Sequence, residues 1–301
     1  MIVEDNMLFN LLAINLWSPT HATGWLAIIV LSLLLGIVHG ITPDEHTWPI
    51  TFSYAIGSYS TRRGLRAGLI FSLAFTIQRA LTSELAYLGL SRLFTSANID
   101  AIIYVVVGLL MLVAGAFIVR RRTILHLDLP FLRSHHSTDK SITSPWLQDP
   151  RPWMPAVHGF AAGWGFGAFA LILYTVLAPA THSAALAWIP GALFGIGTMI
   201  VQATAGGLFG WMIAKKGLKE MQIRVIALKT AGNTLFYGGI AFALSGIVEL
   251  IYPRINSLSV STGIHIHNLD RIDLPIILVI FTVLGIGLTT MVHQTKAAFK
   301  Q

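Results

Sequence analysis

Apolar runs of about twenty residues recur along the chain and constrain its fold more than any other feature. A helix rises about 1.5 Å per residue, so about 20 apolar residues cross the roughly 30 Å hydrocarbon core of a bilayer. The chain is 54% hydrophobic and 11% charged, against a usual charged fraction of about 25%. The sequence therefore predicts an all-α, polytopic transmembrane helical bundle that forms a single membrane domain over residues 1–301. We expect seven spans, at about 25–41, 64–90, 99–119, 155–177, 185–214, 225–251 and 274–293.

Basic residues gather in the loops on one side of this arrangement. If the N-terminus lies outside, every basic cluster falls in the cytoplasm, as the positive-inside rule requires. These clusters are Arg62, Arg63 and Arg66, the triplet Arg120 to Arg122, Lys215, Lys216 and Lys219, and the tail residues Lys296 and Lys300. The net charge of +7 therefore indicates topology and not a nucleic-acid partner. We expect a protein of the cell (inner) membrane, with the lipid bilayer around it and the C-terminus in the cytoplasm.

The predicted spans divide into two sets of three. The first set covers about 24–120 and the second about 156–252, with a polar cytoplasmic loop at about 120–155 between them. An odd number of spans in each set makes the second set inverted relative to the first, a plan that many transporters use with the substrate site between the halves. The two sets share a Val-His-Gly pattern, at Val38-His39-Gly40 and at Val157-His158-Gly159. The sequence predicts a 3+3 inverted repeat plus a last span at 274–293.

The stretch 36–49 at the end of the first span carries most of the chemistry. Ionisable groups at the end of a membrane helix are costly and indicate a functional site. His39 and Asp44 lie about 140° apart on an unbroken helix, but Pro43 cannot donate to the His39 carbonyl and disfavours a continuing helix. An unwound turn brings His39, Asp44 and His46 together, with the freed His39 carbonyl as a further oxygen ligand. Imidazole and carboxylate groups suit Ni²⁺, Co²⁺ or Zn²⁺.

We therefore expect a metal site formed by His39, Asp44 and His46, with Glu45 and His158 as additional ligands. The alternatives are a solvated polar loop for 36–49 and, for His158, a surface position at a helix start. Other histidines lie in predicted loops and would collect metal weakly if they bind it at all: His126, His135, His136, His265 and His267.

Arg79 and Glu84 interrupt the second span. Each charge would cost about 2.5–3.5 kcal/mol at an unpaired position in a helix centre, so both are expected to face the bundle interior or to lie nearer the outer end of the span. Arg79 either holds helices together or neutralises a carboxylate of the site.

The pattern H-x4-D-x-H from His39 to His46 resembles the H-x4-D-H signature of the nickel/cobalt transporter family, with Glu45 inserted before the last histidine. The resemblance covers about residues 25–60. It implies a permease, related to small membrane exporters, that moves a divalent metal ion and leans to uptake.

The expected function is transport of a divalent transition-metal ion, Ni²⁺ or Co²⁺ and possibly Zn²⁺, without enzymatic activity or a permanently bound cofactor. Two alternatives stay open: an exporter of a small sulfite-like anion or an amino acid, and a membrane assembly factor that delivers metal to an enzyme. The chain has no cysteine. This excludes thiol electron carriers of the disulfide-reductase type and thiolate metal sites.

Overall fold

The computed structural model describes residues 24–90, 98–119, 147, 149–165, 167–214, 218–263 and 271–299. Helices dominate these residues, and a two-stranded antiparallel pair supplies the strands. The elements in chain order are α2 (Trp25–Ile41), α3 (Trp48–Gly57), α4 (Thr61–Leu85), η1 (Ala86–Leu90), α5 (Ile99–Ile118), α6 (Met154–Ala162), α7 (Ala168–Ile172), η4 (Leu173–Leu177), η5 (Pro179–Thr181), α8 (Trp188–Ala214), α9 (Glu220–Ile251), η6 (Pro253–Ser257), β1 (Val260–Ser261), β2 (Arg271–Ile272), α10 (Leu274–Val279), η7 (Ile280–Leu288) and α11 (Thr289–Ala298).

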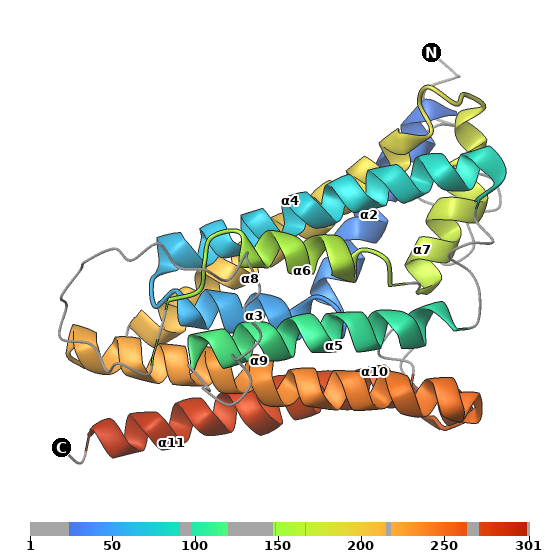
Figure 1. The fold of residues 1–301 in the computed structure, drawn as a ribbon. Helices are drawn as coiled ribbons and strands as arrows, with labels where there is room; N and C mark the ends of the chain where they lie inside the picture. The colour runs from blue at the N-terminus through green and yellow to red at the C-terminus, as the bar shows by residue number, and fades with distance from the viewer. Residues whose placement is uncertain are drawn as a thin grey trace.

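Four helical segments in the described residues are long and apolar enough to cross a membrane: Ile99–Ile118, Trp188–Ala214, Glu220–Ile251 and Leu274–Phe299. The long helices run side by side along the length of the molecule (Figure 1). The prediction of an all-α polytopic membrane protein is confirmed. Of the three other predicted spans, α2 is apolar but shorter, and the apolar part of the fourth is reduced to Phe169–Thr181.

The remaining predicted span is α4, a 25-residue helix with charges inside it. Its outward face is apolar nonetheless, because every fourth residue from Leu65 to Leu81 is a large exposed hydrophobe. Its inward face buries Gln78 and Arg79. A helix with its apolar stripe outward and its polar groups inward is suited to a lipid environment, where polar side chains face the bundle interior.

The α4 and α8 helices pack with their backbones almost in contact. A Cβ atom on Gly64 would lie 2.3 Å from the Gly206 oxygen, and one on Gly206 would lie 2.6 Å from the Gly64 oxygen. Towards the other end of the pair, Gly191 faces the carbonyl of Arg79. The pair is therefore antiparallel, and the small residues are what permits the close approach.

The α5 and α9 helices repeat this arrangement. Gly108 and Gly239 approach each other's carbonyl oxygens, at 2.7 and 2.5 Å from an added Cβ, and Gly246 faces the carbonyl of Ala101. This pair is antiparallel as well. The two helix pairs thus share one packing geometry, and the 3+3 inverted repeat stays a prediction.

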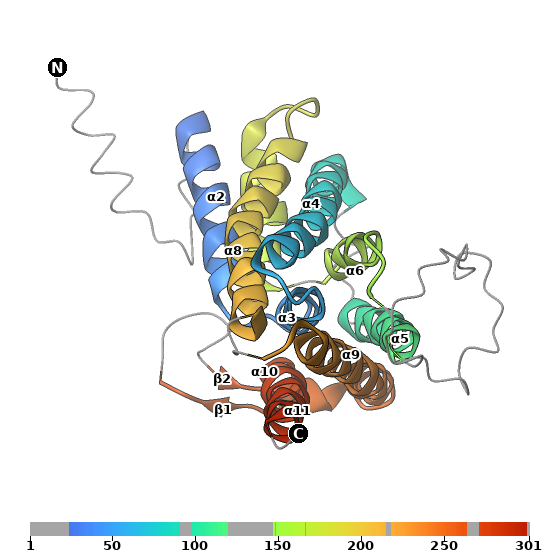
Figure 2. The same cartoon turned by 90° about the vertical axis from the view of Figure 1, so that its left-hand side faces the viewer.

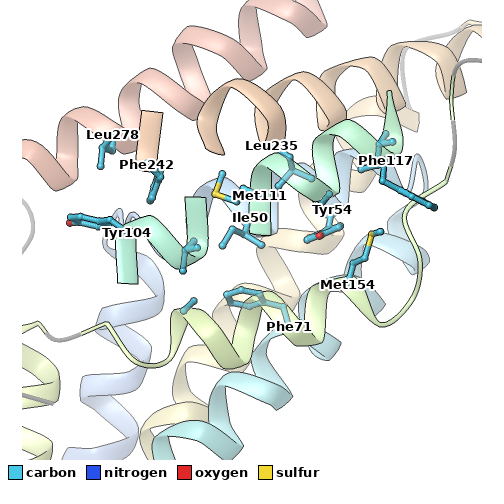
Figure 3. Close-up of a cluster of buried hydrophobic side chains, with 14 of the residues drawn as sticks. Ile50, Tyr54, Phe71, Tyr104, Met111, Phe117, Met154, Leu235, Phe242 and Leu278 are labelled. Carbon is cyan, nitrogen blue, oxygen red and sulfur yellow. The ribbon is translucent and has the colours of Figure 1, made fainter. Parts of the chain in front are cut away.

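The short helix α3 lies inside the bundle. Nine of its ten residues are buried, all but Trp48, and it contacts α4, α8 and α9 (Figure 2). Ile50 and Tyr54 on α3 join a hydrophobic cluster with Met111, Leu235 and Phe242 from α5 and α9 (Figure 3). The α2–α3 unit is therefore a broken helix whose second part is surrounded by protein.

The prediction of one continuous helix at 155–177 is wrong, because the structure has two helices there. The helix α6 ends at Ala162 and α7 begins at Ala168, with a glycine-rich connection between them. The Gly165 carbonyl in this connection accepts a hydrogen bond from Arg79 Nη2 at 2.9 Å, so the broken helix keeps its polar backbone satisfied through a side chain of the other half. The histidines of the 120–155 loop, and His265 and His267, lie outside the described residues.

Candidate metal centre

The α2 helix ends at Ile41 because the backbone turns extended at Thr42, with φ −68° and ψ 141°. The backbone carbonyls that have no helical partner at the break accept hydrogen bonds from side chains. Thr42 Oγ1 donates to the His39 carbonyl at 3.2 Å, and Trp48 Nε1 and Gln202 Nε2 donate to the Gly40 carbonyl at 3.2 and 3.3 Å. The His39 carbonyl that we expected as a metal ligand is therefore engaged by the threonine hydroxyl.

The turn after the break gathers Asp44, Glu45 and His46 into one cluster. One ligand-type atom from each of the three lies within 4.8 Å of the others. The backbone N–H of His46 donates to Asp44 Oδ1 at 3.0 Å, and His46 Nδ1 lies 3.1 Å from Glu45 Oε1. His39 Nδ1 approaches from the end of α2, 3.7 Å from Asp44 Oδ2. The structure therefore brings together four of the five residues that the sequence singles out.

The imidazole of His46 is held on both sides. Its ring stacks on Tyr104 with centroids 5.1 Å apart. On the other side, Gly165 in the connection between α6 and α7 is so close that a Cβ there would lie 3.0 Å from the ring. Tyr104 also donates its hydroxyl to Glu45 Oε1 at 3.1 Å. Among the described residues, His46 Nε2 is buried and has no hydrogen-bond donor or acceptor. A buried ring nitrogen in this condition suits a metal ligand.

His39 lies in an aromatic environment. Its ring is 5.8 Å from Phe75, 5.8 Å from Phe169 and 5.2 Å from Phe194, centroid to centroid. These rings come from α4, α7 and α8, so both halves of the chain enclose the same histidine. The apolar rings lower the local dielectric around His39, which strengthens electrostatic interactions there.

His158 lies outside this cluster. Its Nδ1 is 3.1 Å from the hydroxyl of Tyr54 and 3.0 Å from the carbonyl of Met154. The resemblance between Val38-His39-Gly40 and Val157-His158-Gly159 therefore does not place the second histidine beside the first.

Arg79 connects the two halves next to the centre. Its side chain is 4% exposed, and Nη1 donates to the hydroxyl of Tyr174 at 2.8 Å while Nη2 donates to Gly165. Its guanidinium also lies over the rings of Phe75 and Phe194, at 4.9 and 5.6 Å. These contacts fit the structural role expected of Arg79, and they keep a positive charge at the wall of the site.

A cavity of about 220 Å³ joins the centre to one end of the bundle. His39, Asp44, Glu45 and His46 line its deep part. Its lining includes five carboxylates against two arginines, so the cavity favours a cation. The carboxylates that the sequence did not suggest as site residues are Asp100, Glu249 and Asp273.

The comparison with protein families gives one match. The family described as "Cytochrome C biogenesis protein transmembrane region" matches residues 80–240, just over half of the 301-residue chain. The chain belongs to this family. Neither the curated proteins nor the solved structures yield a match.

Membership in the cytochrome c biogenesis transmembrane family corrects the resemblance to nickel/cobalt transporters. That resemblance depended on a short pattern around a proline turn, from His39 to His46, whereas the family match extends over α5 to α8 and parts of α4 and α9. The matched residues do not include the helix break. Asp44, Glu45 and His46 therefore lie outside the matched region, and with no cysteine in the sequence, no side chain of this chain can carry thiol chemistry.

Proposed function

We propose that the protein is a membrane metal-delivery factor. It binds a divalent transition-metal ion at Asp44, Glu45 and His46 and delivers it to a partner for the assembly of a metalloprotein. The observation that carries this proposal is the buried cluster itself: three ligand-type atoms within 4.8 Å on one turn of a broken helix. Membership in a family described by cytochrome c biogenesis supports an assembly role, since cytochromes c are themselves metalloproteins.

The ligand chemistry supports a borderline divalent ion. Two carboxylates offset the charge of a dication, and a neutral imidazole favours Ni²⁺, Co²⁺ or Zn²⁺ over hard ions such as Mg²⁺. Tyr104 supplies the outer hydrogen bond that orients Glu45, as outer partners commonly do for metal ligands.

Translocation of the ion across the bilayer is the second candidate. The broken helices favour it, because many transporters place their ion sites at such breaks. An exporter of small anions is disfavoured by the same cavity, since five carboxylates line it and would repel an anion.

The test compares His46→Ala with His158→Ala in purified protein, titrated with Ni²⁺, Co²⁺ and Zn²⁺. His158 is the matched control, a buried histidine outside the cluster. We expect His46→Ala to weaken metal binding by about 100-fold or more, because losing a ligand should cost at least as much as losing a residue that only hydrogen-bonds to a ligand, which costs up to about 100-fold. His158→Ala should bind metal like the wild type. Thermal unfolding of each variant checks that the bundle is intact.

Unchanged binding in His46→Ala, or no binding by the wild type, would overturn the proposal. Metal flux into proteoliposomes then separates the two candidates: binding with flux indicates translocation, and binding without flux indicates delivery to a partner.

A further inference from the structure

One side chain of α8 bonds to both sides of the break between α2 and α3. The amide nitrogen Nε2 of Gln202 donates to the Gly40 carbonyl at 3.3 Å, just before the break, and to Thr47 Oγ1 at 3.4 Å, just after it. The proposed metal ligands, residues 44–46, lie between these two acceptors in the sequence. The α8 helix contacts both α2 and α3 (Figure 2), so Gln202 bridges the break from a neighbouring helix.

The orientation of the Gln202 amide follows from its two partners. The Gly40 carbonyl can only accept a hydrogen bond, so the amide must turn its nitrogen, and not its oxygen, towards it. That nitrogen carries two protons, one for each acceptor. Gln202 is 1% exposed and Thr47, the N-cap residue of α3, is 0% exposed. Both hydrogen bonds therefore lie in the protein interior, where the low dielectric strengthens them.

The backbone that carries Gln202 is fixed by close helix packing. A Cβ on Gly40 of α2 would lie 2.7 Å from Val201 Cβ, and a Cβ on Gly68 of α4 would lie 2.6 Å from the Gln202 carbonyl oxygen. Two helices thus approach the same turn of α8. A side chain on such a rigid segment can hold its partners in one geometry.

The Gln202 bridge determines where the ligand turn lies relative to α2. Within the turn, the Asp44 carbonyl accepts hydrogen bonds from the N–H groups of Thr47 and Trp48, at 3.3 and 3.0 Å. These bonds shape the turn itself. His39 lies on the other side of the break, with Nδ1 3.7 Å from Asp44 Oδ2, and this distance depends on how the turn is seated against the end of α2.

We propose that Gln202 is a positioning residue of the metal centre, which holds the turn of residues 44–46 against His39 by joining Gly40 to Thr47. This inference rests on the proposed function, because it concerns the ligand geometry of the same site. A transition-metal ion commonly takes four or more ligands, and residues 44–46 offer one atom each. The bridge keeps the His39 imidazole, expected as a ligand from the sequence, within reach of the same ion.

The test compares two conservative variants on α8 in the full-length protein. Gln202→Met keeps the length of the side chain and removes both donors, and the Gly40 carbonyl still accepts a hydrogen bond from Trp48. Thr198→Val is the matched control. Thr198 is 0% exposed and lies one turn earlier on α8, and its hydroxyl donates at 3.1 Å to the carbonyl of Gly36, in the unbroken part of α2.

The probe is Co²⁺, because its visible absorption bands report the number and geometry of its ligands. We expect Gln202→Met to weaken Co²⁺ binding by about 10-fold, the lower end of what outer partners of metal ligands contribute, and to change the shape of the absorption bands. Thr198→Val should keep the affinity within about twofold and show the wild-type spectrum. Both variants lose buried hydrogen bonds, so both should unfold at a lower temperature than the wild type.

A double-mutant cycle with His39→Ala tests whether Gln202 acts through His39. Two substitutions that disturb the same contact are not additive. In the His39→Ala background, Gln202→Met should therefore change the Co²⁺ affinity by no more than about twofold. A full additional loss there would show that Gln202 does not act through His39 and would refute the inference.

The remaining outcomes separate this inference from the proposed function. Wild-type affinity and spectrum in Gln202→Met would refute the positioning role and leave the proposed function standing. An equal loss of affinity in Thr198→Val would assign the effect to the packing of α2 on α8 and refute it as well. If the wild type binds no Co²⁺, the proposed function fails and this inference with it. If Gln202→Met does not fold, Gln202→Asn replaces it with the same expected results, because its amide is one methylene shorter.

Discussion

Replacing Tyr104 by phenylalanine removes one oxygen atom from the wall of the metal centre and leaves the ring in place. The hydroxyl donates to Glu45 Oε1 at 3.1 Å, and the ring stacks on His46 at 5.1 Å. Tyr104→Phe therefore tests the hydrogen bond without removing the stacking. We expect weaker metal binding, because Glu45 loses the donor that holds it in the ligand position.

The size of the effect follows from that single bond. A hydrogen bond to a charged group contributes about 1.5–3 kcal/mol, and each 1.4 kcal/mol corresponds to a tenfold change in an equilibrium constant. The expected loss in metal affinity is therefore about 10-fold to 100-fold, the range found for outer partners of metal ligands. Calorimetric titration of Ni²⁺ or Zn²⁺ into the purified variant measures it.

Tyr54→Phe is the matched control. Tyr54 is also a buried tyrosine, but its hydroxyl is 3.1 Å from His158 Nδ1, outside the cluster. Its removal should leave metal affinity within about twofold of the wild type and lower only the stability, by about 1 kcal/mol. Wild-type affinity in Tyr104→Phe, or an equal loss in Tyr54→Phe, would refute the reasoning that the Tyr104 bond organises the centre.

Two further predictions concern pH and helix packing. An imidazole binds metal only when deprotonated, so metal affinity should fall as the pH is lowered, and a flat profile in a calorimetric pH series would argue against histidine ligation. A Cβ on Gly191 would lie 2.1 Å from the Arg79 carbonyl, so Gly191→Ala should destabilise the bundle by about 1–3 kcal/mol. Gly207→Ala on the same helix meets nothing closer than 3.6 Å and should unfold thermally like the wild type, whereas equal melting of both variants would contradict the close α4–α8 approach.

The helix ends show what local sequence can predict. The first span was expected to end at residue 41 and the fifth at residue 214, and α2 and α8 end at Ile41 and Ala214. The end of α2 follows from a local cause, the proline two residues later. The break after α6 has no proline. Glycines permit it locally, but the partner of the Gly165 carbonyl is Arg79 of another helix, a contact that no local pattern reveals.

The same distinction applies to the residues of the metal centre. Asp44 and His46 were predictable together because they are close in sequence and follow a proline that turns the chain. Tyr104 and Glu249 were not, because their inward orientation is set by how α5 packs on α9. His158 was chosen for a local likeness to His39, but its place is decided by Tyr54 on a distant helix.

The proposed ligands are three consecutive residues, and this has a consequence for how the protein is made. A site assembled from distant helices exists only after the last of them has packed. Contacts between neighbours in sequence close quickly and pay little loop entropy, so the Asp44–His46 turn can form once α2 and α3 are inserted. An ion can then bind while the second half of the chain is still being synthesised. If an ion binds at that stage, the later helices pack around a loaded turn, and the metal supply during synthesis then affects how the bundle assembles.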